Sequence, residues 1–166
     1  MKINIEPLQS DHDIESFSCG VPALEQWLRQ IARQHARKGI SRTYVAVDPD
    51  RREIVRGYYS VTVGEAHSPD LPQDLARKLP KKIPIVLIGR LAVATDMQGK
   101  GLGSVLLVDA LARIVRISEE VGISAILVDA KNSQAVKFYR HHGFLPLPGD
   151  ANRLVLPVST VKVALQ

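Results

Sequence analysis

Gln98-Gly99-Lys100-Gly101-Leu102-Gly103 is the stretch of this sequence that decides its fold. It follows an apolar run over residues 85–94 and opens a long segment with helical periodicity. Glycine lets the backbone turn sharply and approach a ligand closely, and the first N–H groups of a helix bind anions. The spacing matches neither of the common nucleotide-binding glycine motifs. The stretch therefore predicts a phosphate-binding loop between a strand and a helix, with an ordinary tight turn as the alternative.

The length and composition indicate a single domain over residues 1–166. Hydrophobic residues make up 45% of the chain and charged residues 23%, as is usual for a soluble protein. No apolar run is long enough to span a bilayer, and the first residues lack the apolar segment of a signal peptide. Cys19 is the only cysteine, which excludes an internal disulfide and a cysteine metal cluster. We expect a cytoplasmic protein with no metal and no membrane partner.

The chain is basic, with a formal net charge of +5 and a pI of about 9.5. One basic cluster contains Arg29, Arg33, Arg37, Lys38 and Arg42, and a second contains Arg77, Lys78, Lys81 and Lys82. Such an excess favours an anionic partner, for example a nucleic acid or a polyphosphate cofactor, with solubility as the alternative.

Hydrophobic periodicity predicts an α/β fold with a mixed sheet and helices on both of its faces. The expected strands cover residues 2–7, 43–47, 54–63, 85–94 and 124–129, a short segment after 143–144, and 154–165. The expected helices cover residues 21–36, 68–79, 102–121 and 133–142. We expect 43–47 and 54–63 to form an antiparallel hairpin, and 85–94 to be a central strand buried on both faces.

Two further features lie in the second half of the chain: Asn132 after a buried strand, and a run of aromatic and basic residues from Phe138 to Phe144. Gln98, Gly101 and Gly103 match the pattern Q/R-x-x-G-x-G/A, and Ala135, Phe138, Tyr139, Gly143 and Phe144 match A-x-x-F-Y-x-x-x-G-F. With these motifs the whole chain resembles the GCN5-related N-acetyltransferase (GNAT) superfamily. The resemblance implies an N-acetyltransferase whose mixed sheet splays between its fourth and fifth strands.

The same resemblance implies where acetyl-CoA binds. Leu91, Ala92 and Val93 would pair with the pantetheine arm through their backbone, and an N–H group there would polarise the thioester carbonyl. The pyrophosphate would lie against the backbone of Gln98, Gly99, Lys100, Gly101, Leu102, Gly103 and Ser104. Asn132 and Phe138 would complete the site. For Asn132 the alternative is to cap the next helix, and for Lys100 it is to be a solvated lysine.

Tyr139 occupies the position at which the family's motif places a general acid. The leaving group is a thiolate whose conjugate acid has a pKa of about 8.5, and a tyrosine with a pKa of about 10 can donate a proton to it. The alternative is that the ring packs in the core. Direct transfer from acetyl-CoA needs no cysteine nucleophile, so Cys19 is expected to be a core or loop residue.

The N-terminal half of the chain narrows the resemblance to the acetyltransferase toxins of type II toxin–antitoxin systems. The similar segments there are Phe17-Ser18-Cys19-Gly20, Leu24-Glu25-Gln26-Trp27-Leu28 and Ser41-Arg42-Thr43-Tyr44-Val45. The match continues with Gly57-Tyr58-Tyr59-Ser60, Gly89-Arg90-Leu91-Ala92-Val93 and the glycine stretch from Gln98 to Gly103. This resemblance implies acetylation of the α-amine of aminoacyl-tRNA, which blocks translation. It also implies a ribbon-helix-helix antitoxin, operator DNA bound only through that antitoxin, and a homodimer. The alternative is a GNAT enzyme that acetylates a small-molecule amine or a protein N-terminus.

Arg90 places a charge inside an apolar strand, which is costly unless the charge is paired or reaches a cleft. We expect it at the mouth of the substrate site, where it would contact tRNA phosphates together with Arg33, Arg37, Arg77 and Lys78. A structural ion pair is the alternative. The sequence offers no clear general base. None is required, because the amine of an aminoacyl ester is less basic than a free α-amine, whose pKa is about 7.7–8.0.

Overall fold

A computed structural model describes residues 2–166 of the chain. These residues divide into two compact units, 2–62 with 89–110 and 63–88 with 111–166. Within the described residues the strands form one mixed sheet in the order β1-β2-β3-β4-β5-β7-β6, and both β3 and β4 contribute residues to each unit. The expected α/β fold with a mixed sheet is confirmed.

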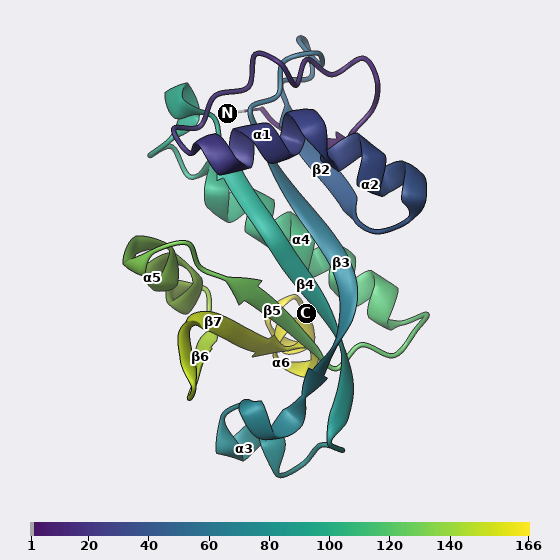
Figure 1. Cartoon of the computed structure of the whole chain (residues 1–166), viewed down its shortest axis with the longest axis vertical. Coiled ribbons are helices and arrows are strands. Elements are labelled where there is room, and N and C mark those ends of the chain that lie inside the picture. Colours follow the sequence, from purple (N-terminus) through teal and green to yellow (C-terminus); the bar gives the residue numbers. More distant parts are fainter. Residues whose placement is uncertain (1) are drawn as a thin grey trace. The chain divides into compact units, whose positions relative to one another are not determined.

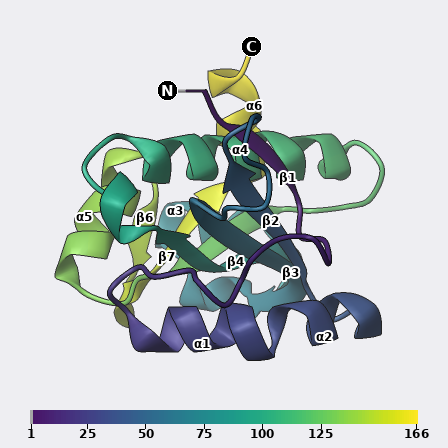
Figure 2. The same ribbon diagram turned by 90° about the horizontal axis from the view of Figure 1, so that it is seen from above.

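The first unit is an antiparallel sheet covered by helices on both faces. Its strands are β1 (Asn4–Pro7), β2 (Arg42–Val47), residues 57–62 of β3 (Gly57–His67) and residues 89–93 of β4 (Lys82–Val93). As expected, β2 and β3 pair antiparallel, with Tyr44 opposite Tyr59. Figure 2 shows α1 (Pro22–Gln30) and α2 (Ala32–Lys38) along one face of β2 and β3, and the first part of α4 (Leu102–Ser118) along the other.

Two neighbouring tyrosines on β3 connect this sheet to the helices on its opposite faces. The hydroxyl of Tyr58 donates a hydrogen bond to the Leu24 carbonyl in α1 at 2.7 Å. The hydroxyl of Tyr59 donates to the Asp109 carboxylate in α4 at 2.6 Å. Because successive side chains of a strand point to opposite faces, each helix layer is attached to β3 by its own buried hydrogen bond.

The helix expected over residues 21–36 is divided in two. Ile31 separates α1 from α2 with a φ of −121° and a ψ of −35°, although its N–H still donates to the Trp27 carbonyl at 2.9 Å. Leu28 and Ala32, four residues apart on either side of the break, are both fully buried. The apolar stripe is therefore continuous across Ile31, which is why periodicity alone predicts one helix.

The second unit is built on the parallel pairing of β4 with β5 (Ala125–Asp129), in which Ile85 lies opposite Ala125 and Ile88 opposite Val128. β7 (Asp150–Pro157) pairs antiparallel with β5 and with β6 (Leu145–Leu147), as Figure 1 shows. Two further helices of this unit are α5 (Ser133–His141) and α3 (Gln73–Ala76), the latter preceded by the short 3₁₀ helix η1 (Ser68–Asp70). The expected single helix over 68–79 is thus interrupted, with Pro72 at the start of α3.

The C-terminal segment differs from its prediction. The strand expected over residues 154–165 ends with β7 at Pro157, and residues Val158–Ala164 form the helix α6. Proline has no N–H with which to continue a ladder of hydrogen bonds. Val158 and Val161 are both buried while Val163 is 71% exposed. Buried residues three positions apart are typical of a helix, whereas a strand would bury every second residue.

In the first unit, β3, β4 and α4 approach one another closely at Gly57. A Cβ atom at this position would lie 2.9 Å from the Ala92 carbonyl oxygen and 3.0 Å from a methyl carbon of Leu106. We expect Gly57→Ala to lower the free energy of unfolding by about 1–3 kcal/mol, because a backbone atom has to move. Urea denaturation measures the change.

Gly122→Ala is the control for Gly57→Ala, since no atom lies within 4 Å of a Cβ at that position. Equal stabilities of the two variants would contradict the close packing at Gly57.

Candidate active site

The glycine loop runs from a short 3₁₀ helix, η2 (Thr95–Met97), into α4. Gly99 and Gly101 have φ values of 77° and 86°, in the left-handed region that favours glycine, and no atom lies within 4 Å of a Cβ built on either residue. The Val105 N–H donates to the Gly101 carbonyl as the helix begins, so the amides of Leu102 and Gly103 have no acceptor within it. This open turn at the start of a long helix is suited to an anion.

The loop is attached to an earlier segment of the chain through Gln98 and Thr95. The side-chain amide of Gln98 donates to the carbonyls of Cys19 and Val93 at 2.9 and 3.0 Å. The backbone N–H and the hydroxyl of Thr95 both donate to the Ser18 carbonyl, at 2.9 and 3.2 Å. Gln98, which sequence analysis assigns to the cofactor, therefore uses its amide nitrogen to shape the loop.

Glu25 in α1 holds that earlier segment in place. One carboxylate oxygen accepts hydrogen bonds from the amides of Cys19 and Gly20 at 2.8 and 3.1 Å and from the Ser18 hydroxyl at 3.4 Å. The backbone hydrogen bond from Cys19 is the main cause that lowers the pKa of the Glu25 carboxyl. We call Phe17–Gly20, Glu25 and Gln98 the loop brace. It connects α1 to the glycine loop within the first unit.

The end of β4 leads into the loop with Leu91, Ala92 and Val93. Ala92 is buried, whereas Leu91 and Val93 are half-buried on the other face of the strand. This part of the expected cofactor site and the glycine loop lie in the same unit.

Arg90 is held by an aromatic stack. Its guanidinium carbon lies 4.3 Å from the ring centre of Trp27, whose ring stacks on Tyr58 at 6.0 Å with an interplanar angle of 10°. Burial is the main cause that lowers the pKa of Arg90. No carboxylate in residues 2–166 forms an ion pair with it, so a cation–π contact takes the place of the ion pair considered above.

Four other basic residues are expected to contact the substrate: Arg33, Arg37, Arg77 and Lys78. Arg33 donates from one guanidinium nitrogen to the carbonyls of Gln9 and His12 at 2.8 and 2.9 Å, which fixes the turn after β1. Arg37 is exposed near the end of α2. In the second unit, the exposed Arg77 pairs with Asp74 at 2.9 Å, and its neighbour Lys78 is exposed.

Tyr139 lies in α5 of the second unit. Its side chain is buried, and its ring makes edge contacts with Phe138 and Phe144 at centroid distances of 5.2 and 5.6 Å. Burial is the main cause that raises its pKa to about 12, so the hydroxyl stays protonated at neutral pH. Within residues 2–166 the hydroxyl has no hydrogen-bond acceptor. The ring is fixed while the polar end remains available.

Asn132 forms the N-cap of α5. Its side-chain oxygen accepts a hydrogen bond from the Ala135 amide at 2.9 Å, so capping accounts for this oxygen. Phe138 packs its ring against Tyr139 and against His142 at 5.0 Å. Both residues thus fix the helix that carries Tyr139.

A comparison with protein-family models finds an acetyltransferase (GNAT) domain over residues 27–146. The chain belongs to the GNAT acetyltransferase family. This match covers Arg90, the glycine loop and Tyr139, and it includes residues of both units. The protein is therefore an acyltransferase by family.

The GNAT chain is similar to two curated toxins along most of its length. A tRNA-acetylating toxin from Mycobacterium tuberculosis is 39% identical over 144 residues, which are 87% of this chain and 85% of the relative. A probable toxin TacT from Sinorhizobium fredii is 30% identical over 95% of this chain and 92% of the relative.

Solved structures similar to this GNAT chain contain a tRNA, acetyl-CoA or a segment of an antitoxin. AtaT complexed with acetyl-methionyl-tRNAfMet is 32% identical with a TM-score of 0.92, over 99% of this chain and 100% of that chain. AtaTR bound with AcCoA is 32% identical with a TM-score of 0.87, over 99% and 98%. A tyrosine-to-phenylalanine mutant of AtaT bound to the C-terminus of the antitoxin AtaR is 29% identical with a TM-score of 0.85, over 99% and 98%.

Residues 2–166 contain no cluster of histidine, cysteine and acidic side chains able to hold a metal ion. None of their helices is long and apolar enough to cross a membrane.

Sequence analysis misses the functions of Glu25 and Trp27 in this GNAT protein. Both lie in a segment quoted for its resemblance to toxins. Glu25 bonds a nearby turn that in turn contacts Gln98, and Trp27 contacts Arg90 directly. Glu25 gives one signal, because it is an acidic residue in the first turn of a helix that follows a Cys-Gly turn. No pattern in the sequence indicates that Trp27 stacks under Arg90.

The loop brace predicts a defect in acetyl-CoA binding when it is broken. We expect Glu25→Ala and Gln98→Ala each to weaken acetyl-CoA binding by about 3- to 10-fold, since each removes hydrogen bonds that shape the loop. Because both residues hold the same segment, the double variant should lose less than the product of the single losses. Titration calorimetry measures the dissociation constants.

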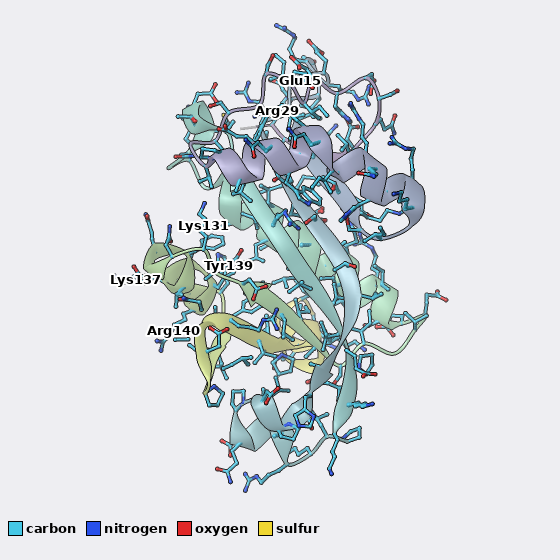
Figure 3. The ribbon with its side chains drawn as sticks, viewed as in Figure 1. Glu15, Arg29, Lys131, Lys137, Tyr139 and Arg140 are labelled. Atoms are coloured by element: carbon cyan, nitrogen blue, oxygen red, sulfur yellow. The ribbon has the colours of Figure 1, made fainter. Side chains whose placement is uncertain are left out.

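Glu15→Ala is the matched control for Glu25→Ala, since Glu15 is an exposed carboxylate of the same unit, labelled in Figure 3. Wild-type affinity in both brace variants would show that the brace does not shape the cofactor loop.

Proposed function

We propose that this protein is a toxin of a toxin–antitoxin system that transfers the acetyl group of acetyl-CoA to the α-amine of aminoacyl-tRNA and so blocks translation. The main support is the match, along essentially the whole of both chains, to AtaT solved in complex with acetyl-methionyl-tRNAfMet. The tRNA-acetylating relative from Mycobacterium tuberculosis supports the same reaction. Residues 1–166 would act as one domain.

The first unit supplies a cradle for acetyl-CoA. Backbone N–H groups of Gly99, Gly101, Leu102, Gly103 and Ser104 would bind the pyrophosphate, with Lys100 adding charge. The positive φ values and the open Cβ directions of Gly99 and Gly101 support this, because a ligand can approach the loop backbone closely. Leu91, Ala92 and Val93 would pair with the pantetheine arm where the sheet splays, and an N–H group there would polarise the thioester carbonyl.

Tyr139 would serve the leaving sulfur. With a pKa of about 12, the hydroxyl is protonated and able to donate throughout the physiological range. Full proton transfer to a thiolate, whose conjugate acid has a pKa of about 8.5, is uphill by roughly 5 kcal/mol. The hydroxyl therefore acts first as a hydrogen-bond donor that stabilises negative charge as it develops on sulfur, which a free and fixed donor does well.

The acceptor amine requires little help. The amine of an aminoacyl ester is less basic than a free α-amine, whose pKa is about 7.7–8.0, so much of it is neutral and nucleophilic. Water or a backbone carbonyl can accept the released proton.

Arg90 would contact tRNA phosphates at the entrance for the substrate. The stack on Trp27 fixes its guanidinium without neutralising its charge, so it is ready to pair with an anion. Arg37 and Lys78 would add exposed positive charge, and Arg77 would do so while paired with Asp74. Arg33 would act mainly by holding the turn after β1.

The partners would be those of a toxin–antitoxin pair in the cytoplasm. We propose a ribbon-helix-helix antitoxin, operator DNA bound only through that antitoxin, and a homodimer. The AtaT structure with the C-terminus of its antitoxin supports an antitoxin partner.

The proposed reaction is tested with labelled acetyl-CoA and four acceptors: aminoacyl-tRNA, deacylated tRNA, peptides and small amines. We expect label only in aminoacyl-tRNA. Tyr139→Phe should lower kcat by about 100-fold or more, because it removes the donor to sulfur, and should leave acetyl-CoA affinity unchanged. Label confined to peptides or small amines would replace the proposed substrate, and an unchanged kcat would remove Tyr139 from the mechanism.

Arg90→Gln should weaken aminoacyl-tRNA binding and leave acetyl-CoA binding unchanged. Because one phosphate contact is lost, the slope of log K against log salt should decrease by about 1 in magnitude. Filter binding at several salt concentrations measures this slope. Arg116→Gln, which removes an exposed charge from α4, is the control. If both variants keep the wild-type slope, Arg90 does not contact phosphate.

A further inference from the structure

Helix α5 carries basic residues that neither sequence analysis nor the proposed mechanism uses. Lys131 lies just before its N-cap, and Lys137 and Arg140 lie within it, all three with exposed side chains. Figure 3 labels these residues together with Tyr139, which the same helix carries. We call Lys131, Lys137 and Arg140 the α5 strip.

The α5 strip is not neutralised by its surroundings. Within residues 2–166 none of its three cations forms an ion pair. The nearest acidic residue in the sequence, Asp129, is bound by Arg153 through two hydrogen bonds of 2.8 and 3.2 Å. The positive charge of the strip therefore remains available to an anion from outside.

The spacing of the α5 strip brings like charges together. Lys137 and Arg140 are three residues apart in a helix, so these two side chains are neighbours on one helical face. Neighbouring like charges destabilise a helix, and a bound anion removes this repulsion. An anion bound at this face would therefore offset the repulsion between Lys137 and Arg140.

The helix holds the α5 strip at a fixed position relative to the Tyr139 hydroxyl. The Asn132 cap fixes the start of α5, and the packing of Tyr139 between Phe138 and Phe144 fixes its rotation. Tyr139 faces the core, and Lys137 and Arg140 lie within one helical turn of it on the exposed side. A substrate whose reacting end reaches Tyr139 therefore has its adjoining groups within reach of these long side chains.

We propose that Lys131, Lys137 and Arg140 bind the phosphate backbone of the acceptor end of tRNA and position its aminoacyl ester beside Tyr139. This inference rests on the proposed function. Lysine and arginine contacts to phosphates set the position of a nucleic acid without reading its sequence, which suits a surface made only of exposed cations. The α5 strip would act on the acceptor and not on acetyl-CoA.

Lys137→Gln/Arg140→Gln tests the α5 strip with two acceptors that carry the same amino acid. One is aminoacyl-tRNA, and the other is the ester of that amino acid with adenosine, which has no phosphate. For the tRNA we expect kcat/KM to fall about 10- to 100-fold, mainly through KM, and the salt slope to decrease by about 2 in magnitude. For the adenosine ester, kcat/KM should not change, and neither should the KM of acetyl-CoA.

Lys2→Gln/Arg116→Gln is the matched control, since it removes two exposed positive charges elsewhere and changes the net charge equally. It should retain the wild-type salt slope. Thermal unfolding followed by circular dichroism compares the stability of the two double variants.

The outcomes separate the inference from the proposed function. A wild-type protein that does not acetylate aminoacyl-tRNA overturns both. A wild-type protein that does so, with a Lys137→Gln/Arg140→Gln variant that keeps its KM and salt slope, overturns the role of the α5 strip alone. Equal losses with both acceptors would mean that the variant acts through Tyr139. A raised KM for acetyl-CoA would assign the strip to a phosphate of that molecule, and loss of antitoxin binding alone would assign it to a protein partner.

Discussion

The carboxylate of Glu25 is the contact on which the first unit of this protein depends. It accepts hydrogen bonds from the amides of Cys19 and Gly20 and so fixes the turn that they form. The backbone carbonyls of this segment then accept hydrogen bonds from Gln98 and Thr95. A single charged group thus determines the shape of a loop more than seventy residues away. Gly99, Gly101 and Gly103 have no side chains, so the side-chain hydrogen bonds that shape this loop come from Gln98 and Thr95 at its start. Charge-assisted hydrogen bonds are well suited to this because they are strong and directional.

Burial of Tyr139 favours the catalytic role that we propose for its hydroxyl. Packing between aromatic rings removes solvent from the ring and raises the pKa, which keeps the proton on oxygen. A hydroxyl bonded to a protein acceptor would have to break that bond before it could help a substrate. The hydroxyl of Tyr139 has no acceptor among residues 2–166, so it can donate without rearrangement.

Local patterns predicted much of this structure, and two of the elements that they missed have local explanations. The glycine loop, β4 and α5 follow from positive-φ glycines, a continuous apolar run and helical periodicity, all of which are properties of short segments. The break at Ile31 leaves the apolar stripe intact, so periodicity cannot reveal it. The helix after Pro157 could have been found, because proline ends a strand and the buried valines beyond it are three residues apart.

The candidate site was predicted in the same uneven way. Tyr139 and the glycine loop belong to motifs with fixed spacing. The stacking of Arg90 on Trp27 joins positions 63 residues apart, and no pattern in either segment indicates it. An alternative considered from sequence, capping by Asn132, is found in the structure because the geometry of a helix start is local.

The stack of Arg90 on Trp27 has a consequence for the entropy of binding. A free arginine side chain has about 2 kcal/mol of rotamer entropy, much of which is lost when a ligand immobilises it. Here the aromatic ring already restricts the guanidinium before any ligand arrives. An anion that binds Arg90 as we propose would therefore meet a side chain with few conformations left to lose, and more of the electrostatic attraction would appear as affinity. A lysine at this position would lack the planar group that stacks, and would bind the same anion from a mobile chain.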